Sequence, residues 1–290
     1  MTANILVNGL ISGGIYALLA AGFTLVFGVA KIMNMAHTAF YMICAFLLFM
    51  GGSKFHIPTP ISAILSILVT GTVAIICYRL FFDRVKQHIT AVMIISIALA
   101  ILFQEIFLIS YSGYFQNVPP FITGFIEIAG IRVSYQHLIA VCASIVSLSF
   151  VWLLLSKTKL GNAIKAVAED REIANVMGIN VSRISMITMG ISVVLASIAA
   201  IVVASIFMVH PLMWTHPLII ILAAVVLGGL GSVKGAVIGA FILGFAETAV
   251  VSLIPNGAFL RGAVSLSVMV FVLILKPEGL YGVVFEEERL

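Results

Sequence analysis

The sequence predicts an all-α, polytopic membrane protein, a helical bundle with about 8–9 transmembrane spans, some of them short or broken. Hydrophobic residues make up 62% of the 290 residues and charged residues only 9%, whereas soluble domains carry about 25% charged residues. So much apolar surface requires lipid as its solvent. Long apolar runs such as 61–77 and 186–209 lack the polar alternation of a β-barrel. The backbone is therefore expected to cross the bilayer as helices.

Apolar runs between polar breaks place these crossings along the chain, because about 20 apolar residues span a bilayer. The expected spans are 5–28, 36–51, 59–80, 89–110, 137–156, 186–209, 217–230, 235–253 and 261–275. The runs 36–51 and 217–230 are short, so each is a candidate for a broken or re-entrant helix packed inside protein. Residues 1–290 are interpreted as a single transmembrane domain with one long loop at 157–185.

Basic residues are concentrated in alternate loops between the expected spans, and the positive-inside rule places those loops in the cytoplasm. If Lys31 is cytoplasmic and crossings alternate, only three of the 15 basic residues fall outside, namely Lys54, Arg132 and Arg261. The cytoplasmic set comprises Lys31, Arg79, Arg84, Lys86, Lys157, Lys159, Lys165, Arg171, Arg183, Lys234, Lys276 and Arg289. This distribution predicts an outer N-terminus and a cytoplasmic C-terminus. The basic residues form no stripe that would bind nucleic acid, so no nucleic-acid partner is expected.

The cytoplasmic segment 157–185 is the longest one on its side. Connections in helical bundles are short, so a loop of about 30 residues needs a reason. Within it, 168–178 is predicted as a small helix with Asp170 as N-cap and Gly178 as its C-terminal stop. An apolar face follows from Ala166, Val167, Ile173, Ala174 and Met177. Such a helix rests either on the bilayer surface or in a groove of a partner protein.

Polar side chains inside the spans are candidates for the translocation path. An ionised carboxylate at the bilayer centre costs about 2.5–3.5 kcal/mol on insertion scales, so it should face a partner or a water-filled cavity. Glu247 and the pair Gln104 and Glu105 meet this description. Asn34 and His37 lie at the cytoplasmic start of the second span, where His37 is favoured as a structural hydrogen-bonding residue.

Glycines gather in the first span and in the late pair of spans. Gly9 with Gly13 and Gly235 with Gly239 have the small-xxx-small spacing that lets two helices approach closely. Helix packing is the favoured interpretation, and the alternative is an interrupted helix beside the translocation path. The same two alternatives apply to three glycines in the late pair, Gly228, Gly229 and Gly231.

Three segments and the tail resemble the LivH-type permeases of branched-chain amino acid ABC transporters. They are NGLISGGIYALLAAGFTLVFGVAKIMNMAHTAF at 8–40, AVAEDREIANVMGINVSR at 166–183, AAVVLGGLGSVKGAVIGAFILGFAE at 223–247 and LKPEGLYG at 275–282. The resemblance covers nearly the whole chain in order. It departs at Thr38, which follows His37 where the family usually has glycine.

The resemblance implies a permease subunit of an ATP-driven importer for amino acids, branched-chain ones first, or similar small polar solutes. It implies three kinds of protein partner besides membrane lipid: a homologous permease, two cytoplasmic ATP-binding subunits and an extracytoplasmic solute-binding protein. The location would be a bacterial or archaeal inner membrane. The implied ATPase coupling residues are Ala166, Glu169, Asp170, Arg171, Ile173, Ala174, Met177 and Gly178.

Cofactors are expected on the partners and none on this chain. The segment GGLGSVKG at 228–235 does not match the phosphate-binding pattern G-x-x-x-x-G-K-[ST], so ATP and Mg²⁺ belong to the partner subunits. His210 and His216 lie in a turn without a neighbouring cysteine or carboxylate, and a solvated turn is favoured over a metal site.

Two other functional classes are alternatives to a permease subunit. An ion-coupled secondary transporter acting without an ATPase could use Glu105 and Glu247 as proton carriers, but it has no use for the long basic loop. An intramembrane enzyme needs a nucleophile with a base or a metal cluster, and the sequence has neither G-x-S-x-G nor H-E-x-x-H. No catalytic residue is therefore expected.

Overall fold

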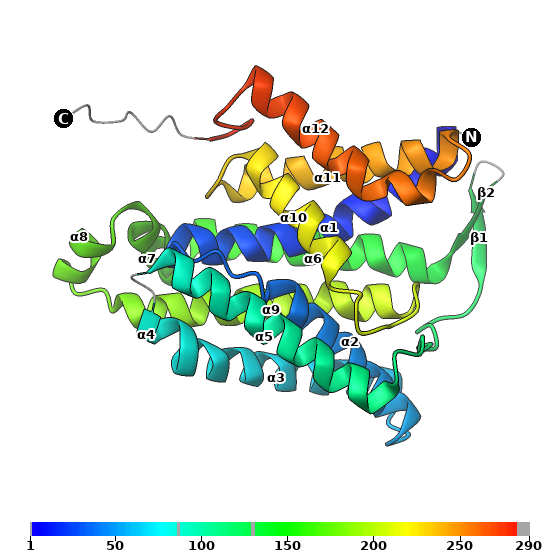
Figure 1. Ribbon diagram of the computed structural model, residues 1–290, viewed down its shortest axis with the longest axis horizontal. Helices are drawn as coiled ribbons and strands as arrows, with labels where there is room; N and C mark the ends of the chain where they lie inside the picture. The colour runs from blue at the N-terminus through cyan, green and yellow to red at the C-terminus, as the bar shows by residue number, and fades with distance from the viewer. Residues whose placement is uncertain (1, 86–87, 129–130, 283–290) are drawn as a thin grey trace.

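A computed structural model describes residues 2–85, 88–128 and 131–282. Most of the long helices run along the long axis of an elongated bundle (Figure 1). Helices α7 (Lys159–Glu169) and α8 (Arg171–Val176) lie at one end, which we call the α8 end. Strands β1 (Phe125–Ile128) and β2 (Ile131–Ser134) form an antiparallel hairpin at the other end, which we call the hairpin end.

Each predicted span corresponds to a helix. The helices are α1 (Thr2–Ala30), α2 (His37–Ser53), α3 (Thr59–Cys77), α5 (Ile89–Tyr111), α6 (Tyr135–Lys157), α9 (Val181–Ala204), α10 (Thr215–Gly228), α11 (Val233–Leu253) and α12 (Arg261–Leu275). A π-helical turn, η1 (Tyr78–Phe82), and α4 (Asp83–Val85) extend α3, and a 3-10 turn, η2 (Gly257–Leu260), precedes α12. Within the described residues, seven helical segments are long and apolar enough to cross a membrane, and α2 and α10 are shorter apolar helices.

The two short helices explain why the span count is about eight or nine. The 17 residues of α2 cover about 26 Å and the 14 residues of α10 about 21 Å, whereas the hydrocarbon core is about 30 Å thick. After α1, Lys31 turns the chain with φ of 50°. The following residues return into the bundle, where Ile32 and Ala36 are buried, so α2 begins at a fully buried His37.

The largest differences from the prediction are the two ends of α9 and the β-hairpin. Helix α9 begins at Val181, inside the predicted loop 157–185, because the Asn180 side chain accepts a hydrogen bond from the Arg183 N–H at 2.9 Å and caps the helix there. It ends at Ala204, five residues before the predicted end at 209, and residues 205–206 form a turn. The hairpin was not predicted, because strands of four residues are too short to show a clear alternation of polar and apolar residues.

Helix α1 is the centre of the bundle and packs against α6, α9, α10 and α11 (Figure 1). Its middle carries small residues, and Ala17, Ala20 and Ala21 are fully buried. Its backbone meets that of α11 at Gly244, where an added Cβ would lie 2.5 Å from the Gly13 nitrogen. Glycine at both positions lets the two backbones touch, as the small-residue pattern predicts.

Lys86 and the tail from 283 onward, which contains Arg289, lie outside the described residues. These two basic residues belong to the predicted cytoplasmic set. The described chain ends at Gly282, where the segment after α12 packs on the α10–α11 turn through a hydrogen bond from the Tyr281 N–H to the Gly228 carbonyl at 2.9 Å.

Candidate functional site

A buried carboxylate, Glu247, joins three helices in the half of the bundle nearer the hairpin end. The Tyr16 hydroxyl of α1 donates a hydrogen bond to Glu247 Oε2 at 2.8 Å. The Ser265 hydroxyl of α12 donates to Oε1 at 3.4 Å, and His216 Nε2 of α10 lies 3.4 Å from the same oxygen. Only 4% of the Glu247 side chain is exposed. The partners that an intramembrane carboxylate requires are thus supplied by α1, α10 and α12.

Glu247 lies on the wall of a cavity of about 730 Å³, a volume typical of small-molecule sites. Its lining contains one carboxylate, one arginine (Arg261) and three histidines, which are His137, His210 and His216. The uncharged polar lining residues are Asn8, Ser12, Tyr16, Tyr41, Thr215, Thr248 and Ser252. We call this space the Glu247 cavity. Its mixture of one negative and one positive side chain with neutral polar groups suits a small polar solute without net charge.

His210 lies at the rim of the Glu247 cavity, in the turn between α9 and α10. Its ring packs against Phe115 with the ring centroids 5.1 Å apart. Partial burial disfavours the charged imidazolium, so the pKa of His210 is lowered from its ordinary value. Among the described residues no group of three or more histidine, cysteine or acidic side chains could hold a metal ion.

His37 and Asn34 are buried away from the Glu247 cavity. His37 Nε2 lies 3.1 Å from the Leu19 carbonyl of α1, and its Nδ1 lies 3.2 Å from the Ser192 hydroxyl of α9. Asn34 Oδ1 accepts a hydrogen bond from the Ala36 N–H at 3.1 Å, just before α2 begins. Both residues thus fix the start of α2 inside the bundle. Of the two roles predicted for them, the geometry favours helix packing.

Gln104 ties α5 to the turn before α10. Its Oε1 accepts a hydrogen bond from the Trp214 indole N–H at 2.9 Å, and its Nε2 donates to Glu105 Oε1 at 3.2 Å. Glu105 itself is exposed on the surface of α5. Gln104 does not line the Glu247 cavity, whose lining includes Met213 of the neighbouring turn and His216 of α10.

The three late glycines shape the α10–α11 turn at the α8 end. Gly229 and Gly231 have φ of 100° and 89°, a conformation that side-chain-bearing residues rarely adopt. A Cβ at Gly228 would collide with the backbone of Gly235 in α11. These positions are therefore required by the tight turn and the close contact between the two helices.

The predicted helix 168–178 is two helices. Helix α7 ends at Glu169, and Asp170 takes an extended conformation, with φ of −146° and ψ of 118°. Asp170 Oδ1 accepts hydrogen bonds from the N–H groups of Glu172 and Ile173 at 2.8 and 2.9 Å, which starts α8 anew. Gly178, with φ of 86°, follows the end of α8. Ala166 consequently belongs to α7 rather than to the helix predicted with Met177.

Helix α8 packs against the bundle with one face and is exposed on the opposite face. Ala174 is 4% exposed and packs in a cluster that includes Val29 of α1 and Val167 of α7. The exposed side carries three apolar side chains, Ile173, Val176 and Met177, with 63%, 85% and 76% exposure. We call these three residues the α8 patch. The apolar face predicted to rest on the bilayer or on a partner included Ala174, and in the structure this small residue instead packs against the chain's own bundle and seats α8.

Most of the partners of Glu247 were not predicted from the sequence. Tyr16 and Ser265 were not singled out, and His216 was assigned to a solvated turn. The signal that could have identified them is the need of a buried carboxylate for donors, which directs attention to hydroxyl and imidazole groups in other spans. The sequence does not reveal which spans face Glu247. Val176, the most exposed residue of the α8 patch, was also missed.

Comparisons with known proteins agree with this architecture. A family model described as "Branched-chain amino acid transport system / permease component" matches residues 5–274. The branched-chain amino acid permease BraD of Pseudomonas aeruginosa is 28% identical over 96% of this chain and 94% of its own length. LivH of Salmonella typhimurium is 25% identical over 95% of this chain and 94% of its own. A solved structure, PsaBC from Streptococcus pneumoniae in complex with Fab, has a TM-score of 0.55 at 16% identity and covers 96% of this chain and 94% of its own, a likeness of fold.

These relatives are transport permeases and not enzymes, and their matches extend over nearly the whole bundle. The helices that surround Glu247 and the α7–α8 segment both lie within the matched residues. The chain is thus a multi-pass membrane permease component and belongs to the branched-chain amino acid transport system permease family.

Proposed function

We propose that this chain is one permease subunit of an ATP-driven importer of branched-chain amino acids, working with a homologous permease, two ATP-binding subunits and an extracytoplasmic solute-binding protein. The relatives BraD and LivH are described as high-affinity branched-chain amino acid permeases, which supports this solute class. The Glu247 cavity supports it as well, since an amino acid carries one positive and one negative group and no net charge. ATP and Mg²⁺ would be held by the ATP-binding subunits.

The observation that carries the proposal is the α8 patch. It presents three exposed apolar side chains beyond the ends of the spans, on a helix that is itself fastened to the bundle by Ala174. Exposed apolar side chains on a seated helix are typical of a segment that enters a groove on a partner protein. Helix α8 stands between α6, which leads into the segment, and α9, which leads out of it. A partner that moves α8 would move both spans.

The orientation belongs to the same proposal. The α8 end would face the cytoplasm, as would the C-terminus, because the basic residues of 157–183 and Lys234 lie on that side of the bundle. The Glu247 cavity, in the opposite half, would then face the solute-binding protein. Residues 1–290 would act as a single permease domain.

The test introduces a charge into the α8 patch. Ile173→Asp should weaken ATPase docking by on the order of tenfold or more, because an unpaired charge in an apolar interface costs several kcal/mol. The measurement compares co-purified ATP-binding subunit and solute-stimulated ATPase activity in the assembled importer. Asn162→Asp, an exposed position on α7, is the matched control.

The α8 patch is a better site for this test than Ala174. Ala174→Asp would place a charge in the buried contact and detach α8 from the bundle. Coupling would then be lost whether or not α8 docks on an ATP-binding subunit. Full assembly and coupled uptake with Ile173→Asp would contradict the docking role. If Ile173→Asp instead lowered membrane insertion while leaving ATPase binding intact, the patch would be a lipid-surface anchor.

A further inference from the structure

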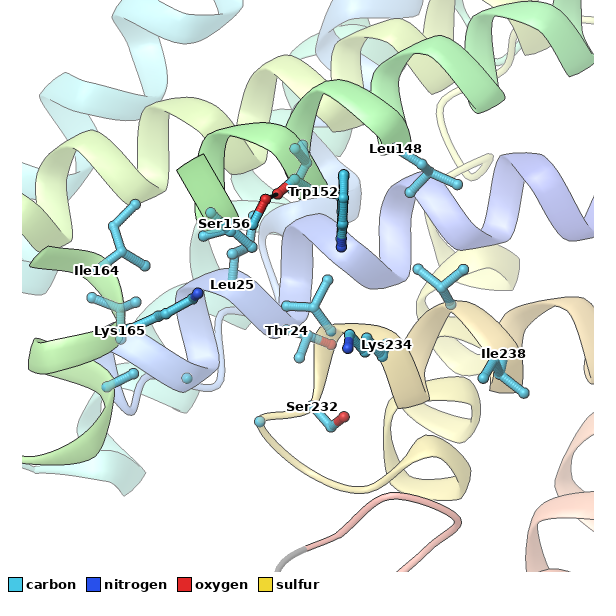
Figure 2. Close-up of a pocket in the computed structure, with 18 of the residues that line it drawn as sticks. Thr24, Leu25, Leu148, Trp152, Ser156, Ile164, Lys165, Ser232, Lys234 and Ile238 are labelled. Atoms are coloured by element: carbon cyan, nitrogen blue, oxygen red, sulfur yellow. Dashed lines mark hydrogen bonds between the residues drawn. The ribbon is translucent and has the colours of Figure 1, made fainter. Parts of the chain in front are cut away.

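A second cavity of about 730 Å³ opens between α1, α6, α7 and α11 at the α8 end. Figure 2 shows its walls, with Leu25 on α1, Leu148 and Trp152 on α6, and Ile238 on α11. The lining is largely apolar, but it carries two lysines, Lys165 and Lys234, and no carboxylate. We call this space the lysine cleft. It is separate from the Glu247 cavity, and the two share no lining residue.

The two lysines enter the lysine cleft from different elements. Lys165 projects from α7, and Lys234 lies in the first turn of α11 on another wall (Figure 2). Both side chains are exposed, and among the described residues neither forms an ion pair or a hydrogen bond. Two ammonium groups without an ion-pair partner above an apolar wall suit an anion that also has an apolar part.

The position of the lysine cleft relative to the spans indicates where that anion comes from. Trp152 and Ser156 belong to the last turns of α6, and α7 follows directly after a one-residue break at Thr158. Tryptophan is enriched at the membrane–water interface, where headgroups lie. Leu148 and Ile238 lie about one helical turn farther along α6 and α11 than Trp152 and Lys234, at the depth expected of acyl chains. The lysine cleft therefore extends from headgroup level into the hydrocarbon.

We propose that the lysine cleft binds an anionic phospholipid, with the phosphate between Lys165 and Lys234 and an acyl chain along α6 and α11. Basic pockets between transmembrane helices on one side of the bilayer bind anionic headgroups. A bound headgroup would bridge α7, which leads into α8, and α11, which carries Glu247. The lipid would thus hold the segment proposed for ATPase coupling against the helix of the buried carboxylate.

The test uses the only two tryptophans of the chain, Trp152 and Trp214. Trp214→Phe leaves Trp152, in the lysine cleft, as the sole indole. The full chain with this change is placed in nanodiscs of phosphatidylcholine that contain a small fraction of brominated lipid. Brominated phosphatidylglycerol should quench Trp152 at a mole fraction on the order of tenfold lower than brominated phosphatidylcholine, since each lysine strengthens binding of an anionic lipid several-fold.

Lys165→Gln with Lys234→Gln should abolish this preference. Lys157→Gln with Lys159→Gln removes the same charge from exposed lysines of the same region that do not line the cleft, so the preference should remain. Equal quenching by the two brominated lipids would overturn the proposal, as would loss of the preference in the control pair. Absence of quenching by either lipid would also overturn it and would indicate that protein covers the cleft.

Two further measurements separate lipid from free anions and from effects of the Trp214 substitution. Inorganic phosphate, matched in ionic strength with chloride, should not displace brominated phosphatidylglycerol, and displacement would assign the lysines to a soluble phosphate instead. Mass spectrometry of lipid retained by the chain with both tryptophans should find anionic phospholipid enriched over the surrounding bilayer. That enrichment should be lost in the Lys165→Gln, Lys234→Gln variant, and its persistence there would contradict the site.

Discussion

The Tyr16 hydroxyl donates a 2.8 Å hydrogen bond to the Glu247 carboxylate, although the two residues are 231 positions apart in the chain. Tyr16 lies in the central helix α1 and Glu247 in α11, the pair of helices whose backbones touch at Gly13 and Gly244. The close approach of the helices brings the phenol within reach of a carboxylate that is otherwise shielded from water. The close packing of α1 and α11 at small residues thus places a hydrogen-bond donor beside the carboxylate of the Glu247 cavity.

Removing the Tyr16 hydroxyl should destabilise the protein. Tyr16→Phe leaves Glu247 with one donor fewer in a buried site, which costs about 1–3 kcal/mol. We expect a lower unfolding temperature in detergent, measured by the loss of soluble, monodisperse protein on heating. Tyr114→Phe, at a 72% exposed position of the hairpin end, should leave the temperature unchanged. Equal temperatures for the two variants would mean that the hydrogen bond contributes no net stability.

Glu247→Gln distinguishes an ATP-driven permease from a proton-coupled carrier. Glutamine keeps the shape of the side chain and one oxygen, which accepts from either Tyr16 or Ser265, but it cannot carry a proton. In an importer driven by ATP, the pH profile of the initial uptake rate should keep its shape. The measurement uses the assembled importer in liposomes, with Glu105→Gln on the exposed face of α5 as the control. A flat pH profile in Glu247→Gln alone would instead indicate proton coupling through this residue.

The spans could be predicted from the sequence because each crossing must form its backbone hydrogen bonds within itself and present apolar side chains to lipid. The seven long apolar segments follow from that requirement, whereas α2 and α10 are too short to cross on their own and the start of α9 is set by the Asn180 cap. The Asp170 cap was predictable too, although the sequence did not show that it divides the segment into two helices. Ala168 and Glu169 are good helix formers, but the side chain of Asp170 offers its oxygen to the α8 N–H groups and ends α7.

The Glu247 cavity could be predicted only in part. The need of a buried carboxylate for partners is a local property of the sequence, but the identity of Tyr16, His216 and Ser265 depends on which helices touch. Which helices touch depends on small residues such as Gly13 in α1 and Gly244 in α11. Small residues four positions apart within one helix indicate a close helix contact, but they do not show which other helix makes it. The side chain of Ala174 likewise has no property that distinguishes a buried contact from an exposed face.

A side chain at Gly244 should separate α1 from α11. Gly244→Val places branched carbons against the Gly13 backbone, where even a Cβ would lie 2.5 Å from the nitrogen. Overpacking of this kind costs about 1–3 kcal/mol or more. Gly190→Ala in α9 is the matched control, because a Cβ there meets no atom within 4 Å and alanine favours the helix. We expect Gly244→Val to lower the yield of folded protein and Gly190→Ala to leave it unchanged or raise it. Normal yield of Gly244→Val would refute the close contact.

Acid should destabilise the hairpin end through His210. Burial lowers the pKa of His210, so below its ordinary value of about 6.5 the unfolded chain binds a proton that the folded chain does not bind. Stability contributed by this residue is therefore lost as the pH falls below about 6.5. His210→Asn should reduce the decrease in unfolding temperature between neutral and mildly acidic buffers, whereas His56→Asn, at an exposed position, should not. The same acid-induced decrease in all three proteins would exclude His210 as its source.

Asp170 should support ATPase coupling through the hydrogen bonds by which it caps α8, and not through its negative charge. Its Oδ1 accepts from two N–H groups at the start of α8, and replacing such a cap by alanine costs about 1 kcal/mol. Helix α8 has only six residues, so that loss should be enough to unseat the α8 patch. Asp170→Ala should lower solute-stimulated ATPase activity of the assembled importer, while Asp170→Ser and Asp170→Asn, which keep a capping oxygen without the charge, should retain most of it. If serine and asparagine fail as alanine does, the carboxylate itself contacts the partner, and Asp170 belongs to the docking surface together with Ile173.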